Sequence, residues 1–279
     1  MEISKELMKK LSELINFLKQ KKVIVAFSGG IDSSLLAYLS GKHAAETLLV
    51  TINSEFMKKS EIKIASNFAR KYDIAHKIIE ISILENQNVQ KNPQNRCYYC
   101  KKFIYSKLKD IRRKLQFDII LDGSNLDDLS DYRPGNRAIK ELKITTPFLD
   151  FNLNKEDIRT LSKHFNFENY DVPSSACLAS RIPYGESIKK ENLDKVEKGE
   201  EFLKTNFDLH QLRVRVHYND LARIELLEDD LVKIITKSKL KKIEHYFKKI
   251  GFRYITLDIE GYRMGSMNEI LDKKSSSNL

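Results

Sequence analysis

The sequence has no tryptophan, five prolines and only three cysteines among its 279 residues. No apolar run approaches the about 18 residues needed to cross a bilayer, which excludes an integral membrane protein. Residues 1–22 are charged every few positions and lack the apolar stretch of a signal peptide, so we expect a cytoplasmic protein. A cytoplasmic chain with an odd number of cysteines is not expected to build structural disulfides.

Acidic residues are fewer than basic ones: the sequence has 39 Asp and Glu and 49 Lys and Arg, which gives a net charge of +10. Most of the excess lies in residues 1–170, with 29 basic and 21 acidic side chains, whereas residues 171–279 carry 20 and 18. Such an excess favours anionic partners such as nucleotides or RNA. No arginine-rich block or basic patch interleaved with aromatic residues is present, so a lysine-rich solvated surface is the simpler explanation.

Short apolar segments alternate with amphipathic ones along residues 1–170. We expect strands at 21–27, 48–52, 76–81 and 118–121. We expect helices at 1–22, 32–39, 58–72 and 99–115. This alternation predicts an α/β fold with a parallel sheet covered on both faces.

The pattern changes near residue 170, and residues 171–279 are predicted to form a second, smaller α+β domain. A charged helix is expected at 189–205 and a helical pair at 229–250. Strands are expected at 212–217, 221–226 and 254–257. The sequence therefore predicts two domains, 1–170 and 171–279.

The segment Ser28-Gly29-Gly30-Ile31-Asp32-Ser33 lies between the first expected strand and a helix. Glycines allow close approach of the backbone, and the amides at a helix N-terminus attract phosphate. No Gly-Lys-Ser/Thr follows, which excludes the Walker loop, and the Gly-x-Gly-x-x-Gly dinucleotide fingerprint is absent. The segment predicts a phosphate-binding loop of another kind.

This loop resembles the Ser-Gly-Gly-x-Asp-Ser loop of the PP-loop ATP pyrophosphatases, which adopt a doubly wound sheet and split ATP between its α- and β-phosphates. The resemblance implies that Asp32 helps to hold Mg²⁺ or the phosphates. Asn53 and Gly123 follow later strands and are expected to contact adenosine, because ligands bind at the carboxyl ends of parallel strands. The expected pyrophosphate ligands are Ser28, Gly29, Gly30, Ser33 and Ser34.

Four further segments, in this order, resemble the LarE family within that superfamily: NRCYYCK (95–101), DGSN followed by DYRPG (122–135), ACLASRIPYG (176–185) and DIEGYRMGSMNE (258–269). LarE proteins are ATP-dependent, AMP-forming sulfurtransferases of nickel-pincer nucleotide cofactor synthesis. They adenylate a carboxylate of a pyridinium dicarboxylate mononucleotide and convert it to a thiocarboxylate. The resemblance thus implies a small-molecule nucleotide substrate and a homo-oligomer, to which residues 261–269 could contribute.

The residue chemistry fits this scheme, because a carboxylate activated by AMP needs a sulfur nucleophile, and thiolate is the competent form. Cys177 is the candidate, and the guanidinium of Arg181 beside it could bind the substrate phosphate. Arg213 and Arg215 are two residues apart on one face of an expected strand and could bind the substrate phosphate. Weaker substrate candidates are Ser180 and Arg263, and weaker candidates for a second metal contact are Glu201 and Glu225.

The three cysteines leave the sulfur source open. Cys97, Cys100 and Cys177 could ligate three irons of a [4Fe–4S] cluster, whose fourth iron would carry a sulfide from an external donor that the sequence does not identify. Alternatively, Cys177 gives up its own sulfur in a single turnover and the CxxC is incidental. Zinc or redox use is disfavoured, since the histidines form no His-x₃₋₅-His pair and the CxxC is flanked by Arg and Tyr.

Two other activities share parts of this pattern. An ATP-dependent tRNA thiolation enzyme would use the same loop and cysteines, but no recognisable RNA module is present after residue 170. An amide-forming ligase is disfavoured because nothing resembles a glutaminase or an ammonia channel. The small-molecule sulfurtransferase therefore ranks first.

Overall fold

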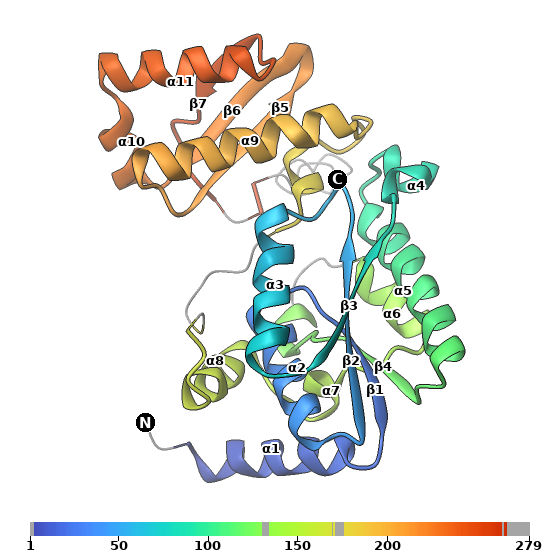
Figure 1. Ribbon diagram of the computed structural model, residues 1–279. Helices are drawn as coiled ribbons and strands as arrows, with labels where there is room; N and C mark the ends of the chain where they lie inside the picture. Colours follow the sequence, from blue (N-terminus) through green and yellow to red (C-terminus); the bar gives the residue numbers. More distant parts are fainter. Residues whose placement is uncertain (1–2, 130–133, 169, 171–175, 264, 267–279) are drawn as a thin grey trace, which may run out of the picture. The chain divides into compact units, whose positions relative to one another are not determined.

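The computed structural model describes residues 3–129, 134–168, 170, 176–263 and 265–266 (Figure 1). The chain forms two compact units, an N-terminal unit of Met1–Val89 with Asn95–Ala176 and a C-terminal unit of Gln90–Gln94 with Cys177–Leu279. The predicted domains, 1–170 and 171–279, stay a prediction. Residues 131–133, 264 and 267–269 of the family segments lie outside the described residues.

The N-terminal unit is built on a parallel sheet in the order β3-β2-β1-β4. Its strands are β1 (Lys22–Ala26), β2 (Glu46–Asn53), β3 (Ala75–Glu80) and β4 (Ile119–Leu121). In the register, Val25 pairs with Leu49 of β2 on one side and with Leu121 of β4 on the other. Because β1 is central, its carboxyl end opens where the chain order reverses, which is where ligands bind in such sheets.

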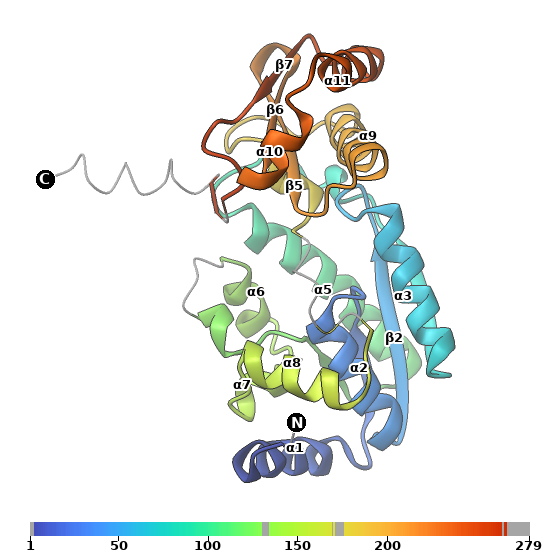
Figure 2. The same cartoon turned by 90° about the vertical axis from the view of Figure 1, so that its left-hand side faces the viewer.

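Successive residues of β1 point to opposite faces, and each face has its own hydrophobic core. Val23 and Val25 pack into a core with α1 (Lys5–Leu18), α2 (Ile31–His43), α3 (Lys59–Lys71) and α8 (Lys155–His164). Ile24 packs into a second core with α5 (Arg96–Leu115) and α6 (Gly135–Glu141). Figure 1 shows α2, α3 and α8 on one side of the strands and α5 and α6 on the other, and Figure 2 shows α8 next to α2. The predicted doubly wound α/β fold is confirmed.

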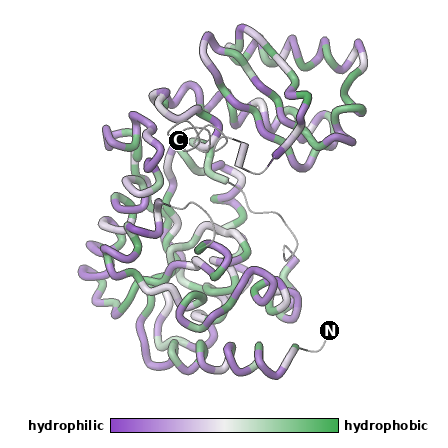
Figure 3. Tube along the Cα trace, turned by 180° about the vertical axis from the view of Figure 1, so that it is seen from behind, coloured by the Kyte–Doolittle hydropathy of each residue, from purple (hydrophilic) through white to green (hydrophobic). Residues whose placement is uncertain are grey.

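Helix α1 shows why the amphipathic segments become helices. Ser4 accepts a hydrogen bond from the amide of Leu7 at 3.1 Å and caps the first turn. Buried leucines recur every three or four residues from Leu7 to Leu18, so one face packs into the core, next to α2. The alternation of hydrophobic and hydrophilic residues along α1 is visible in Figure 3.

Short helices of this unit were not predicted from the sequence. They are α4 (Gln87–Gln90), α6, α7 (Pro147–Asp150) and the 3₁₀ turns Ile83–Glu85 and Leu126–Leu129. Helix α8 was also missed, although Asn154 caps it by accepting a 2.8 Å hydrogen bond from Asp157. No helix of the described residues is both long and apolar enough to span a membrane.

The C-terminal unit has a three-stranded sheet of β5 (Leu212–His217), β6 (Leu221–Leu226) and β7 (Tyr254–Leu257), with β5 and β6 antiparallel and β6 and β7 parallel. Its helices are α9 (Lys190–Phe207), α10 (Glu228–Ile234) and α11 (Lys237–Lys249), and its 3₁₀ turns are Leu178–Arg181 and Tyr218–Asp220. Phe202 of α9 stacks on Tyr246 of α11 with ring centroids 3.9 Å apart. The predicted strands and helices of this α+β part are confirmed.

Residues 90–94 belong to the C-terminal unit although they precede α5 in the chain. Asn92 is fully buried, and its side-chain amide donates to the carbonyls of Ile182 and Pro183 at 3.2 and 2.7 Å. Its own carbonyl accepts from Gly185 at 2.9 Å. These bonds hold the segment before the CxxC against the loop that follows Cys177.

Candidate active site

The phosphate loop joins β1 to α2 at the carboxyl end of the central strand. Gly29 has φ +78°, and a Cβ there would lie 3.2 Å from the backbone nitrogen of Ala65, so only glycine fits without strain. Gly30 caps α2 without a side-chain hydrogen bond. The first amides of α2 therefore have no side-chain cap at Gly30 and can bind an anion.

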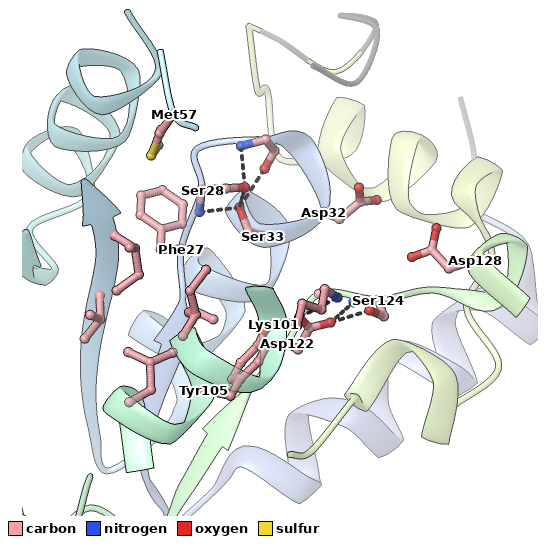
Figure 4. Close-up of a pocket in the computed structure, with 17 residues that line it drawn as sticks. Phe27, Ser28, Asp32, Ser33, Met57, Lys101, Tyr105, Asp122, Ser124 and Asp128 are labelled. Carbon is pink, nitrogen blue, oxygen red and sulfur yellow. Dashed lines mark hydrogen bonds and ion pairs between the residues drawn. The ribbon is translucent and has the colours of Figure 1, made fainter. Parts of the chain in front are cut away.

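Two serines shape the loop. Ser28 Oγ and Ser33 Oγ lie 3.1 Å apart, Ser33 Oγ donates to the carbonyl of Gly30 at 3.0 Å, and the amide of Gly30 donates to Ser28 Oγ at 3.3 Å (Figure 4). These bonds hold the loop in one conformation before any ligand binds.

A cavity of about 360 Å³ opens beside the loop. Its apolar side is formed by Phe27, Val50, Ile52, Met57, Ile104 and Leu108. Its polar side is formed by Ser28, Asp32, Ser33, Lys101, Asp122, Ser124 and Asp128. An apolar wall for a flat base next to a polar wall with a phosphate loop suits a nucleotide. Of the predicted nucleotide ligands, Ser28, Gly30, Asp32, Ser33 and Gly123 line this cavity.

The remaining predicted nucleotide ligands, Gly29, Ser34 and Asn53, are not among the described residues that line the cavity. The Ser34 side chain is fully buried, and its hydroxyl has no hydrogen-bond partner among the described residues. Asn53 ends β2, and its amide donates to Glu80 at 3.1 Å. The contact of these three residues with ATP therefore stays a prediction.

Asp32 is held by two neighbours from other elements. Lys155 Nζ lies 2.5 and 2.7 Å from its two carboxylate oxygens, and Asn125 Nδ2 donates to it at 3.2 Å. Figure 4 shows the carboxylates of Asp32 and Asp128 on the same side of the cavity. Mg²⁺ is typically held by one or two protein carboxylates together with substrate phosphates, so this pair suits it.

The CxxC lies inside α5, which begins at Arg96. Lys101, Ile104, Tyr105 and Leu108 of this helix line the nucleotide cavity. Residues four apart lie on the same face of a helix. Cys97 is four residues before Lys101 and Cys100 is four before Ile104, so both cysteines lie on the cavity-lining face, one turn earlier. Both cysteines are half-buried, and Arg96 Nη2 lies 3.9 Å from the sulfur of Cys97. The structure thus brings the CxxC next to the nucleotide cavity.

Cys177 is exposed and precedes the 3₁₀ turn Leu178–Arg181. Its carbonyl oxygen accepts from Ser180 Oγ at 2.8 Å and from Arg181 Nη1 at 3.0 Å. These bonds fix the backbone of Cys177 and leave its side chain at the surface. No group of three His, Cys, Asp or Glu side chains within the described part of the chain is arranged to hold a metal ion, so ligation by all three cysteines stays a prediction.

The predicted substrate arginines divide into buried and accessible ones. Arg181 pairs with Glu200 at 2.8 Å and Arg215 with Glu225 at 2.5 Å, and the side chains of both pairs are at most 5% exposed. Arg215 also donates to the Ser180 carbonyl at 2.8 Å, so Ser180, Arg181 and Arg215 form one network.

The other substrate candidates are less buried. Arg213 stacks over the Tyr262 ring at 5.1 Å, and burial lowers its pKa. Arg263 pairs with Glu260 at 2.7 Å. Glu201 is exposed on α9, whereas Glu225 is committed to Arg215 and Arg223.

Sequence reasoning missed Lys101, Asp122, Asp128 and Lys155. Signals existed for three of them, since Lys101 lies in the family segment 95–101, and Asp122 and Asp128 lie within 122–135. Nothing in the local sequence pairs Lys155 with Asp32.

Comparisons with known proteins give the relatives of this chain. The family model of the queuosine biosynthesis protein QueC matches residues 22–94, which include the phosphate loop. The chain is 32% identical over 95% of its length to the pyridinium-3,5-bisthiocarboxylic acid mononucleotide synthase of Lactiplantibacillus plantarum, of which 95% is covered. It is 39% identical over 92% of its length to an uncharacterised protein of Methanocaldococcus jannaschii and 35% identical over 95% to one of Synechocystis, each 98% covered.

Proposed function

The chain belongs to the LarE family of ATP-dependent sulfurtransferases, and on that premise we propose that it activates a carboxylate of a pyridinium dicarboxylate mononucleotide with ATP and replaces a carboxylate oxygen by sulfur. The observation that carries the proposal is the face of α5, which lines the nucleotide cavity and continues to Cys97 and Cys100. A cavity for the activating nucleotide and residues suited to sulfur chemistry therefore lie on one helix.

The chemistry follows from the poor leaving ability of a carboxylate oxygen. A substrate carboxylate oxygen attacks the α-phosphorus of ATP, the bond from that phosphorus to the bridging oxygen breaks, and pyrophosphate leaves with the electron pair. A sulfur nucleophile then adds to the acyl carbon, and AMP leaves with the oxygen. The loop amides after Gly30 bind pyrophosphate, and Asp32 and Asp128 would hold Mg²⁺ at the phosphates.

We propose that Cys97, Cys100 and Cys177 hold a [4Fe–4S] cluster. The donor set fits, because three thiolates leave one iron of the cubane open, and the half-buried CxxC lies one turn from the cavity. When bound, the cluster would present sulfide from an external donor, so that the protein turns over repeatedly. The second candidate is a sacrificial Cys177, which the exposure of this side chain favours.

The first experiment is iron and acid-labile sulfide analysis, with an absorbance spectrum, on protein purified without oxygen. About four irons per chain and a broad band near 400 nm are expected for the wild type. Cys97→Ser, Cys100→Ser and Cys177→Ser should each lose most of the iron. An iron-free wild type that loses the mass of hydrogen sulfide after one turnover, with Cys97→Ser fully active, would establish the sacrificial mechanism instead.

Substrate class and assembly need separate tests. We propose a small-molecule substrate and a homo-oligomer, with tRNA thiolation as the alternative. A salt-dependent mobility shift with tRNA would favour the alternative. Pyrophosphate release that depends on the pyridinium dicarboxylate mononucleotide supports the proposed substrate, and light scattering gives the oligomeric state.

A further inference from the structure

Asp122 is a buried carboxylate at the end of β4, only 8% exposed. It accepts hydrogen bonds from the hydroxyls of Tyr105 and Ser124, and from the Ser124 amide at 2.8 Å. Lys101 Nζ lies 3.6 Å from Asp122 Oδ2. The carboxylate therefore links α5 to the turn after β4.

Lys101 has contacts at both its stem and its ammonium group. A Cβ at Gly135 would lie only 2.8 Å from Lys101 Cδ, so the lysine stem passes directly over the Gly135 backbone at the start of α6. Asp122 holds the other end, the ammonium group. A long side chain that is held at stem and tip loses little further entropy when it binds a ligand.

The same cluster faces the phosphate loop. Figure 4 shows Lys101, Asp122 and Ser124 joined by contacts within the cavity that Ser28 and Ser33 also line. Gly123 allows the turn after β4 to lie close to the phosphate loop, because a Cβ at this position would lie only 3.1 Å from the Ser33 amide nitrogen. Among the described residues, Lys101 is the one lysine or arginine that lines this cavity, against three carboxylates.

The Asp122 carboxyl and the Tyr105 hydroxyl both have shifted pKa values. Burial alone would raise the pKa of the Asp122 carboxyl, but the Lys101 ammonium and the hydrogen bonds from Ser124 and Tyr105 outweigh it, so its pKa lies below the usual range. Burial, and next the Asp122 charge, raise the pKa of Tyr105 well above its usual value. Asp122 is therefore ionised and Tyr105 remains a donor.

We propose that Lys101 binds the α-phosphate of ATP during adenylyl transfer and that Asp122 is the positioning residue that, with Gly135, holds its ammonium at the phosphate loop. The role of Lys101 in adenylyl transfer rests on the proposed function, whereas its role in binding ATP does not. The positive charge of Lys101 offsets the negative charge that grows on the phosphate oxygens as pyrophosphate leaves.

The test measures binding of α,β-methylene-ATP with Mg²⁺ by calorimetry, and pyrophosphate release with the pyridinium dicarboxylate mononucleotide. Lys101→Met should weaken analogue binding about 10-fold or more, and Lys101→Arg should recover part of the loss. Asp122→Asn, which keeps the shape, should weaken binding comparably. The double variant should be no worse than Lys101→Met, because both act through one ammonium. The matched control is Lys107→Met, an exposed lysine of the same helix, which should bind like the wild type.

The outcomes separate this inference from the proposed function. Wild-type analogue affinity in Lys101→Met would overturn the role of Lys101. The positioning role of Asp122 would be overturned if the losses of analogue affinity added up in the double variant. It would also be overturned if Asp122→Asn lowered the melting temperature but left analogue binding unchanged. If the wild type binds the analogue but releases no pyrophosphate with the pyridinium substrate, the proposed substrate is wrong, and a weakened Lys101→Met still supports the inference.

Discussion

Lys155 Nζ of α8 lies 2.5 Å from a carboxylate oxygen of Asp32, the acidic residue of the phosphate loop. A lysine ammonium thus lies on the carboxylate that is expected to hold Mg²⁺. The two side chains are about a quarter exposed, so the pair is worth at most about 1 kcal/mol.

Lys155→Met should therefore lower the Mg²⁺ concentration for half-maximal pyrophosphate release, by up to about 5-fold, because the metal no longer competes with the ammonium. Initial rates at fixed ATP and varied Mg²⁺ measure this. Lys163→Met, on the exposed face of the same helix, is the control. A higher Mg²⁺ requirement in Lys155→Met would show that the lysine assists the metal instead.

Gly29 and Gly30 are adjacent but should respond differently to alanine. Gly29→Ala places a Cβ at φ +78° and 3.2 Å from the Ala65 backbone, and should cost about 1–2 kcal/mol and weaken ATP binding. Gly30 has φ −72°, and its Cβ would meet only Ser28 Oγ at 3.4 Å, so Gly30→Ala should change stability by less than about 0.5 kcal/mol. Urea denaturation compares the two, and equal losses would contradict the geometry.

Glu200→Gln should destabilise the protein by about 3–5 kcal/mol, because it leaves the fully buried guanidinium of Arg181 without its carboxylate. The neighbouring Glu201→Gln, at an exposed position, should change the free energy of unfolding by less than about 0.5 kcal/mol. Urea midpoints measured with iron-free protein exclude effects through a cluster. Similar midpoints for the two variants would argue against the buried pair.

Glu141 ties α6 to the CxxC turn of α5. Hydrogen bonds from Tyr98 and Arg137, followed by Lys102, lower the pKa of Glu141 from 4.5 to about 2. A depressed pKa gives stability that is present above 4.5 and is lost as the pH falls towards 2.

Glu141→Gln should therefore lose less melting temperature than the wild type between pH 4.5 and pH 2. Thermal melts across this range measure the difference, which 1 M salt should reduce since the group is exposed. Parallel melting curves for the two proteins would show that the contacts do not persist in solution.

The strands and the phosphate loop could be predicted because their signals are local. The β-branched apolar run before Ser28 and the glycines after it specify a buried strand and a tight turn regardless of the rest of the chain. The CxxC helix was predicted from residue 99 and begins at Arg96, so Cys97, which was expected before the helix, lies on it together with Cys100. That shift places them on the cavity-facing side.

The polar contacts of the site could not be predicted, because their partners are distant in the sequence. Spacing indicated that Arg215 could bind a phosphate, but not that Glu225 of the next strand accepts from two of its three guanidinium nitrogens. Likewise, Asp122 was overlooked beside Gly123, since its partners Tyr105 and Lys101 come from another element. Which carboxylate meets which cation is decided by the tertiary fold.

The five residues Gln90–Gln94 restrict where this chain can be divided into fragments, because they belong to the C-terminal unit. A fragment that ends at Ala176 would keep Asn92 but lose the carbonyls of Ile182 and Pro183 that bury its amide. A fragment that starts at Cys177 would keep those carbonyls and lose the amide. Chimaeras between relatives should therefore exchange residues 90–94 together with 177–279, because a single crossover point mixes the two halves of one buried contact.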